Sequence, residues 1–102
     1  MVTISTVTAA SRVEIRVDEQ LAGFAEYADR DGRRIFVHTE IDPAFEGQGL
    51  GGKLAKGALD DAQALGLPIV PLCPFIASYV ERHPEYQPLV DTDLYEQLRP
   101  RP

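Results

Sequence analysis

The stretch Phe45–Leu54, Phe-Glu-Gly-Gln-Gly-Leu-Gly-Gly-Lys-Leu, decides how the rest of the chain is organised. It places four glycines between positions 47 and 52, and residues that suit a helix follow. Glycine lets the backbone approach a ligand closely, and the first amides of a helix have no partner within that helix. Such a helix start suits an anion, above all a phosphate. The stretch therefore predicts a phosphate-bearing ligand, with a plain flexible turn as the alternative.

Two common phosphate-binding loops share this glycine spacing but need other residues around it. The glycines spell G-x-G-x-x-G, the dinucleotide fingerprint, which needs a strand directly before it and an acidic residue about 20 positions later. Residues 42–46 separate the preceding strand from the glycines, and no carboxylate lies in residues 67–70. A P-loop needs Ser or Thr where Leu54 stands, because that hydroxyl binds magnesium. The spacing therefore favours neither loop.

Length and composition limit the broad class. A chain of 102 residues is expected to form one domain over residues 1–102, with room for one site. No apolar run approaches the roughly 18 residues of a membrane span, and residues 1–10 lack the features of a secretory signal. We therefore expect a cytoplasmic protein that does not bind membranes.

Charge and cysteine content exclude further classes. A net charge of −6 disfavours nucleic acid as a partner, since such binding depends on Lys and Arg. The single cysteine, Cys73, excludes an internal disulfide, and the separated His38 and His83 argue against a structural metal site. The acidity also suits a cationic amine as substrate.

Alternating apolar and polar residues predict three strands, over residues 12–17, 21–28 and 34–41, joined by turns at 18–20 and 29–32. Strict alternation in the third strand puts His38 and Glu40 on one face together with Phe36. The opposite face then carries Ile35, Val37, Thr39 and Ile41. Residues 1–10 are expected to be either a frayed arm or an extra edge strand.

The second half of the chain predicts helices around a short strand. Apolar residues at helical spacing predict a helix over 50–65, with Gly66 as its stop. Residues 67–72 predict a buried strand whose two prolines make it an edge or diverging strand. A second helix is expected over 74–82, and then a loosely held tail over 87–102, in which residues 89–90 could add a strand. The fold class is therefore α+β, a mostly antiparallel sheet with two main helices.

A strand, Asp42-Pro43, a short linker, x-Gly-Gln-Gly-Leu-Gly and an amphipathic helix together resemble the acetyl-coenzyme A binding motif of the Gcn5-related N-acetyltransferases (GNAT). The family motif is Gln/Arg-x-x-Gly-x-Gly/Ala, and Glu46 departs from its first position. The likeness is closer to a small single-domain subgroup with a lone cysteine. It covers roughly residues 35–86 and includes His38-Thr39-Glu40, Pro71-Leu72-Cys73-Pro74-Phe75 and Tyr79 to Tyr86.

The resemblance implies an abbreviated acyl-CoA N-acyltransferase fold with acetyl-CoA as co-substrate. In this family the strands on either side of the long helix splay apart, and the pantetheine arm lies between them. The implied cofactor-binding residues come from the strand before the loop, the loop itself and the segment after the last strand. They are Thr39 and Ile41, then Glu46, Gly47, Gln48, Gly49, Leu50, Gly51 and Gly52, then Cys73, Pro74 and Phe75.

Acyl transfer to an amine needs a base for the amine and a proton for the departing thiolate. Glu40, or a water that it holds, is the candidate base, and His38 is a second candidate because its pKa lies nearest neutrality. The resemblance implies that Tyr79 protonates the thiolate. The alternatives are a solvated Glu40, a packed His38 and a core tyrosine.

Cys73 also has two interpretations. The subgroup treats its cysteine as a candidate active-site residue, and a thiolate at a helix start is a better nucleophile, so Cys73 could carry the acetyl group before the amine receives it. Alternatively, Cys73 is a small buried apolar residue beside the cofactor.

These observations favour an acetyl-CoA dependent N-acetyltransferase that acts on an amine of unknown identity. The alternatives are a catalytically weak or inactive CoA-binding module and a plain interaction domain. A monomer or weak homodimer is expected, because an exposed edge formed by the first strands could pair with a second copy.

Overall fold

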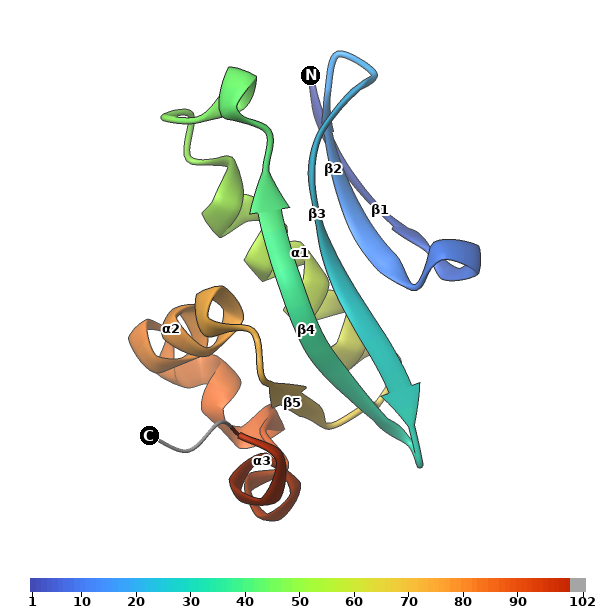
Figure 1. Ribbon diagram of the computed structural model, residues 1–102, viewed down its shortest axis with the longest axis vertical. Coiled ribbons are helices and arrows are strands. Elements are labelled where there is room, and N and C mark those ends of the chain that lie inside the picture. The colour runs from blue at the N-terminus through green and yellow to red at the C-terminus, as the bar shows by residue number, and fades with distance from the viewer. Residues whose placement is uncertain (100–102) are drawn as a thin grey trace.

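A five-stranded sheet, whose strands follow sequence order, forms the framework of the computed structural model, which describes residues 1–99. The strands are β1 (Val2–Val7), β2 (Arg12–Val17), β3 (Gln20–Arg30), β4 (Arg33–Ile41) and β5 (Ile69–Pro71). The helices are α1 (Leu50–Ala64), α2 (Pro74–Arg82) and α3 (Thr92–Leu98). Three 3₁₀ turns complete the order: η1 (Thr8–Ala10), η2 (Pro43–Phe45) and η3 (Pro84–Leu89). Figure 1 shows this arrangement, which confirms the predicted α+β class.

β5 is a short edge strand that leaves most of β4 unpaired on that side. β1 to β4 pair in antiparallel fashion, whereas β5 pairs with β4 in parallel, through only three residue pairs that end at Phe36 and Pro71. Proline cannot donate a ladder hydrogen bond, so Pro71 closes the pairing and the chain turns into α2. Residues 37–41 of β4 continue without a partner on the β5 side, so the predicted divergence of the two strands is confirmed.

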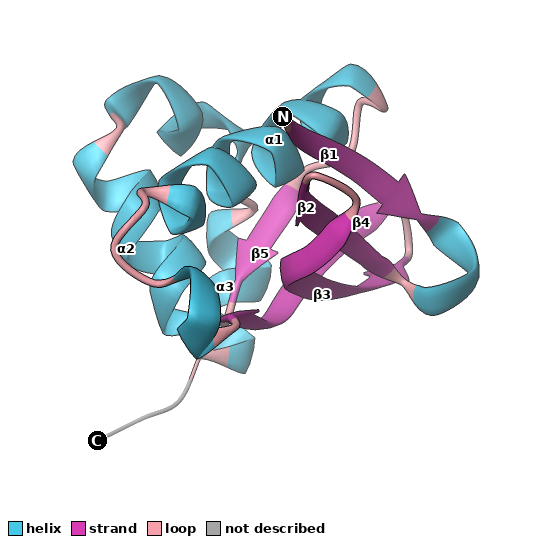
Figure 2. Ribbon diagram, turned by 90° about the horizontal axis from the view of Figure 1, so that it is seen from above, coloured by secondary structure: helices cyan, strands magenta, loops and turns pink. Residues whose placement is uncertain are grey.

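α1 lies across one face of the sheet, and α2 and α3 gather on the side of β5 (Figures 1 and 2). The buried stripe of α1 recurs at helical spacing, which buries one face of the helix against the strands. Tyr27 and Phe36 extend this core, with their rings edge to face and 6.4 Å apart. The largest fully buried side chains are Phe36, Ile15, Leu54, Leu59, Ile69, Ile76, Val13 and Val70.

A register shift in the β3–β4 pair changes which β4 residues share a face. Glu26 lies opposite His38, and the next residue, Tyr27, lies opposite Phe36, so Val37 is an extra residue. Strict alternation is therefore wrong: Phe36 joins the core side, and does not share the face of His38 and Glu40. His38 and Glu40 do lie together, as expected, because they follow the shift.

Both ends of the described chain are attached to the sheet. Residues 2–7 form β1, the edge strand that was one of the two options for residues 1–10, and β1 is anchored by six residue pairs with β2. The tail is more ordered than expected: Asp91 caps α3 and pairs with Arg33 of β4. The expected strand at 89–90 is a single bridge from Val90 to Ile69. The end of the predicted tail, residues 100–102, lies outside the described residues.

Gly23 of β3 occupies a place where only a residue without a side chain fits. A β-carbon there would lie 2.5 Å from the carbonyl oxygen of Glu40 and 2.6 Å from Cδ1 of Ile41. Because the first contact is with backbone, we expect Gly23→Ala to lower the free energy of unfolding by about 2–3 kcal/mol, measured by urea denaturation.

The matched control for this prediction is Gly57→Ala in α1. A β-carbon at Gly57 would meet Cγ2 of Ile4 at 2.8 Å, but Ile4 is 39% exposed and its side chain can turn away. The substitution also gains helix propensity of about 1 kcal/mol, so Gly57→Ala should be near neutral. Equal stability of the Gly23→Ala and wild-type proteins would contradict the packing of β3 against β4.

Candidate active site

The glycine stretch forms a loop that delivers the backbone to the start of α1. Asp42 accepts a hydrogen bond from the Ala44 amide at 2.8 Å, which fixes the exit from β4. Gly47 and Gly49 have φ values of 82° and 72°, in the left-handed region that favours glycine. Gly49 is the N-cap of α1, and no side chain caps the helix. The amides of the first turn are therefore free for a ligand, and no acidic side chain lies among them.

Cys73 and Thr39 lie where β4 and β5 stop pairing, a place that we call the opening. The amide of Cys73 donates to the carbonyl of Phe36 at 2.9 Å, which fixes the chain at the last paired residue. The Cys73 Sγ donates to the hydroxyl of Thr39 at 3.3 Å, and Cys73 is 4% exposed. As N-cap of α2, Cys73 makes no side-chain bond to the helix amides. The thiol is thus directed across the opening toward β4.

His38 and Glu40 form a pair on the face of β4 that carries no core residue. Nε2 of His38 lies 2.8 Å from Oε1 of Glu40, and both side chains are about half exposed. The ring of Phe24 lies beside them, with its centroid 6.2 Å from that of His38. A hollow of about 200 Å³ lies next to this pair and includes Phe24, Glu40 and Asp42 in its lining. The arrangement offers an accessible carboxylate on the face of β4 opposite Cys73.

Phe75 and Tyr79 of α2 face the start of α1. A β-carbon built at Gly51 would lie 2.7 Å from Cζ of Phe75, so a larger residue there would make the Phe75 ring move. Tyr79 lies near Gly52 and stacks on the His83 ring, with a centroid distance of 3.8 Å. Within residues 1–99, the Cys73 thiol makes a hydrogen bond to Thr39 and none to Tyr79.

The structure therefore gathers the predicted residues into three groups. The first is the loop, in which Glu46 and Gln48 are exposed, followed by the first turn of α1, which contains the buried Leu50 and then Gly51 and Gly52. The second is the opening, with Thr39 and Cys73 on the core side of β4 and the His38–Glu40 pair on the other. The third is the α2 surface, with Phe75 and Tyr79. Ile41 packs partly buried against the core, and Pro74 is exposed at the first position of α2.

Several polar residues near these groups were not predicted. Lys53, Lys56, Arg82 and His83 line a hollow of about 470 Å³ beside the loop. In the sequence, the two lysines follow the loop, and Arg82 and His83 end the second helix. Their spacing does not show that the two pairs lie close together in space. Phe24 and Asp42 beside Glu40 were missed for the same reason, since β3 and β4 meet only through the hairpin.

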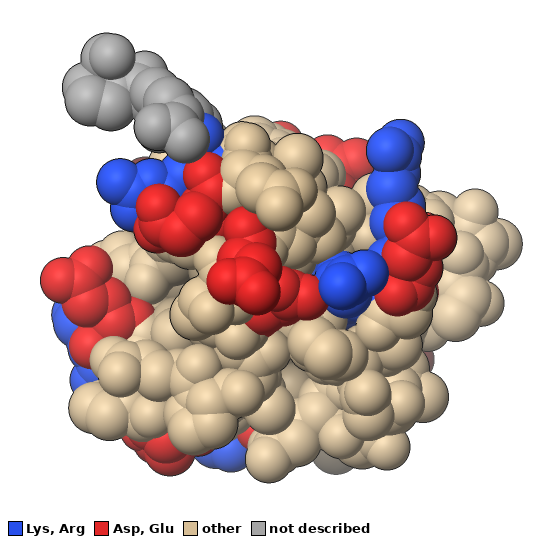
Figure 3. All heavy atoms as spheres, turned by 90° about the horizontal axis from the view of Figure 1, so that it is seen from below, with Lys and Arg blue, Asp and Glu red and all other residues tan. Residues whose placement is uncertain are grey.

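Acidic and basic side chains lie together at the end of the molecule opposite the loop (Figure 3). Figure 3 shows Asp and Glu in a band, with Lys and Arg among them, across the end of the molecule drawn lowest in Figure 1. The loop lies at the opposite end. Exposed carboxylates also lie beside the loop itself, at Asp42 and Glu46.

An ordered network joins α1 to η3 behind the hollow. Asp60 accepts hydrogen bonds from Lys56 at 2.8 Å and from the Tyr86 hydroxyl at 2.7 Å. Burial, followed by the bond to Asp60, raises the pKa of Tyr86 to about 12. Burial alone would raise the pKa of Asp60, but the bonds from Lys56 and Tyr86 lower it. Asp60 therefore stays charged at neutral pH and holds Lys56.

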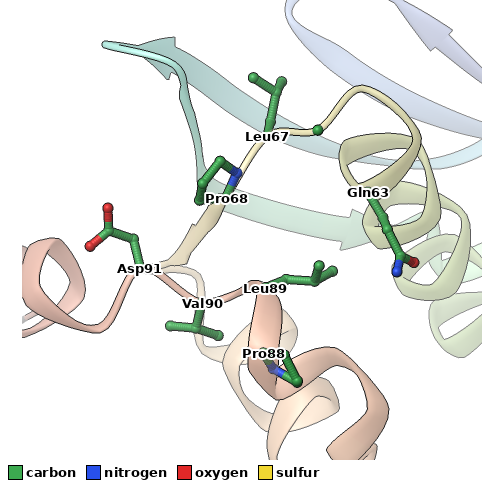
Figure 4. A pocket seen from close by; sticks show the side chains of 8 residues that line it. Gln63, Leu67, Pro68, Pro88, Leu89, Val90 and Asp91 are labelled. Atoms are coloured by element: carbon green, nitrogen blue, oxygen red, sulfur yellow. The ribbon is translucent and has the colours of Figure 1, made fainter.

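A different hollow, of about 380 Å³, lies where η3 and the start of α3 pass β5 (Figure 4). Its lining includes Leu67, Pro68, Leu89 and Val90, and its one charged side chain is Asp91. Asp91 is already engaged with Arg33. This chemistry does not suit a phosphate-bearing ligand. In the described part of the chain, no helix combines the length and the apolar character needed to cross a membrane.

Comparisons with known proteins agree with the geometry. The model of a family described as GCN5-related N-acetyl-transferase matches residues 12–89. A search of curated proteins finds no match. Among solved structures, the chain is similar to a ribosomal-protein-alanine N-acetyltransferase from Brucella melitensis biovar Abortus 2308, with 24% identity and a TM-score of 0.53. The match covers 89% of this chain and 62% of that structure, and it supports the fold.

Proposed function

The chain belongs to the family of GCN5-related N-acetyl-transferases, and from that premise we propose that it transfers an acetyl group from acetyl-CoA to an amine. Family membership supports an N-acetyltransferase activity. The co-substrate and the catalytic roles of single residues are our proposal. One observation carries it: an uncapped helix start beside an opening in the sheet that contains a thiol and, across β4, an accessible carboxylate.

The loop suits the diphosphate of acetyl-CoA. Backbone amides at a helix start bind phosphate oxygens and carry the positive end of the helix dipole. The exposed residues Gly47 to Gly49 leave room for close approach, and the exposed Glu46 side chain is free to turn away. A diphosphate at this point leaves the pantetheine arm to run along residues 37–41 toward Cys73.

The transfer step needs a base on the side from which the amine arrives. The amine nitrogen attacks the thioester carbonyl, the new carbon–nitrogen bond forms, and the carbon–sulfur bond breaks as CoA thiolate leaves. Glu40 takes the amine proton, directly or through a water, and His38 orients its carboxylate through the 2.8 Å contact. We assign protonation of the thiolate to solvent, because Tyr79 lines the hollow at the loop, where the diphosphate is expected, and Cys73 contacts Thr39 instead.

Cys73 is assigned to positioning the thioester and not to carrying the acetyl group. Its Sγ bonds to Thr39, and within residues 1–99 no hydrogen bond or ion pair joins it to a base. An acyl-enzyme would need a base to remove the thiol proton before attack. A small buried thiol facing Thr39 instead shapes the inner wall of the opening.

The experiment mixes the purified protein with acetyl-CoA and a panel of primary amines, and follows the release of free thiol. Turnover with at least one amine is expected, and intact mass spectrometry without amine should show no acetylated protein. Cys73→Ala should keep turnover with a raised KM. Acetylation that is lost in Cys73→Ala would establish the acyl-enzyme instead, and binding of acetyl-CoA without any turnover would identify a CoA-binding module.

A further inference from the structure

β1 forms one edge of the sheet, and it lacks the features that protect such edges. Its sequence, Val-Thr-Ile-Ser-Thr-Val, includes no charged residue, proline or glycine, and it pairs with β2 without a bulge. Within residues 1–99 no strand pairs with its outer side (Figures 1 and 2). Proteins usually protect a free edge with charges, proline or a bulge, because its open amides and carbonyls can bind another strand. β1 is therefore open to strand addition.

The opposite edge of the same sheet is protected. β5 is only three residues long and ends at Pro71. Val90 forms a bridge with Ile69, and the amide of Asp91 donates to the carbonyl of Ile69 at 2.9 Å. The chain thus covers the β5 edge with its own backbone and leaves the β1 edge open.

The backbone of β1 determines how a further strand can attach. The amide of Asp18 donates to the carbonyl of Met1 at 2.9 Å, so the polar backbone groups of Met1 face β2. In an antiparallel pair, the residues that exchange hydrogen bonds alternate along each strand. The odd-numbered residues of β1 therefore bond to β2. Val2, Ile4 and Thr6 direct their amides and carbonyls outward, and an added strand must use them.

The β1 strand of a second copy matches these outward groups. In an antiparallel pairing centred on Ile4, Val2 lies opposite Thr6 of the second copy, and Ile4 lies opposite Ile4 of the second copy. Each such pair can exchange two backbone hydrogen bonds. A pairing centred on Ser5 would leave Val2 without a partner. The register centred on Ile4 is therefore the one that uses the whole edge.

Apolar side chains on the helix side of β1 also favour this pairing. Ile4 lies opposite the fully buried Ile15 of β2 and against Gly57 of α1. Yet Val2 and Ile4 remain 38% and 39% exposed. Opposite residues of an antiparallel pair share a face, so the two Ile4 side chains would cover each other. The pairing thus removes exposed apolar surface from water.

The charges beside β1 also suit a second copy. On the face away from α1, Thr3 lies beside Arg16, and Ser5 lies beside Glu14. The pairing places Thr3 opposite Ser5 of the second copy, so one row runs from Arg16 of one copy to Glu14 of the other. These charges are opposite in sign, and β1 itself carries none. Two chains of net charge −6 can therefore meet here without like charges in contact.

We propose that β1 pairs with β1 of a second copy about a two-fold axis at Ile4, so that two five-stranded sheets become one continuous sheet. The interface is small, with one strand from each copy, so the dimer is weak and its population depends on concentration. The opening lies on the other side of each sheet, between β4 and β5, and stays accessible. The inference does not depend on the proposed function.

Sedimentation velocity over the micromolar to millimolar range tests the interface, with wild type, Ile4→Lys and Ile4→Glu. The average mass of the wild type should rise with concentration, from that of one chain toward that of two. Each variant alone should associate about tenfold more weakly, because like charges then lie directly opposite each other. An equimolar mixture of the two variants should associate again, since Lys and Glu then lie opposite each other.

Cysteine variants test the register. The Cα atoms of a hydrogen-bonded antiparallel pair lie about 5.5 Å apart, which a disulfide can span. Ile4→Cys should therefore form a disulfide-linked dimer on mild oxidation, detected by intact mass. Ser5→Cys is the matched control, because it lies opposite Thr3 and not opposite itself. The native Cys73 is buried and common to both variants.

A second control, Leu65→Lys, places the same charge on a 58% exposed apolar residue at the end of α1, and should leave association unchanged. A wild type that stays monomeric at millimolar concentration would overturn the proposal. Equal effects of Ile4→Lys and Leu65→Lys would also overturn it, as would a disulfide in Ser5→Cys in place of Ile4→Cys. Urea denaturation at micromolar concentration checks that each variant folds, and the cysteine variants decide the question if the charged ones do not.

Discussion

Glu40→Gln is expected to lower kcat by about a hundredfold or more, while the dissociation constant for acetyl-CoA stays within about twofold of wild type. The substitution keeps the shape of the side chain but removes the group that accepts the amine proton. Because Glu40 is about half exposed, its loss should not alter stability. Initial rates of thiol release and calorimetry with acetyl-CoA measure the two quantities separately.

Two comparisons make this prediction specific. Glu26→Gln removes a carboxylate from the strand next to Glu40, opposite His38, and should leave kcat near wild type. The Glu40→Gln rate should also recover in part as the pH rises toward the amine pKa of about 10.4, since solvent then removes the proton. If Glu40→Gln turns over at the wild-type rate at neutral pH, Glu40 is not the base.

Gly49→Val is expected to weaken the binding of acetyl-CoA by about a hundredfold, through two effects at the same residue. A β-branched side chain at a φ of 72° is strained, by about 1–3 kcal/mol, so the loop must change conformation. The new side chain also occupies the space in front of the first amides of α1, where the diphosphate is expected. Calorimetry with acetyl-CoA measures the loss.

The matched control is Gly66→Val, at the other end of the same helix. Gly66 has a φ of 71°, and a β-carbon there meets nothing within 4 Å, as at Gly49. The two variants should therefore lose similar stability in urea denaturation. Only Gly49→Val should lose affinity, and a comparable loss in Gly66→Val would mean that binding depends on helix stability and not on the loop.

Much of the fold follows from local patterns along the chain. Alternation predicted β2, β3 and β4, and the apolar period predicted α1 to within one residue of its end. Proline at position 74 marked the start of α2, since its fixed φ suits a first helical turn. Alternation gave the wrong face for Phe36, where the β3–β4 register shifts. The extra residue, Val37, arises from the pairing with β3, and the spacing of apolar residues within β4 does not reveal it.

The tail shows a second limit of local reasoning. Scattered apolar residues and prolines suggested loose attachment, yet Asp91 both caps α3 and pairs with Arg33, a residue 58 positions earlier. Arg34 shows the same limit. Its side chain is only 3% exposed, lies between Asp29 and Asp61, and covers the Tyr27 ring at 3.8 Å. Charged residues normally suggest a surface position, and only contacts from β3 and α1 together explain a buried one.

By itself, the sequence determined the loop, because Gly47 and Gly49 directly before an amphipathic helix allow the left-handed backbone that the turn into α1 uses. It also determined that His38 and Glu40 share a face of their strand. Only the tertiary structure decided that Thr39 meets Cys73 across the opening, and that Lys53 and Arg82 border one hollow. These contacts join residues that are 34 and 29 positions apart, and they form because core packing brings α2 against β4 and the start of α1.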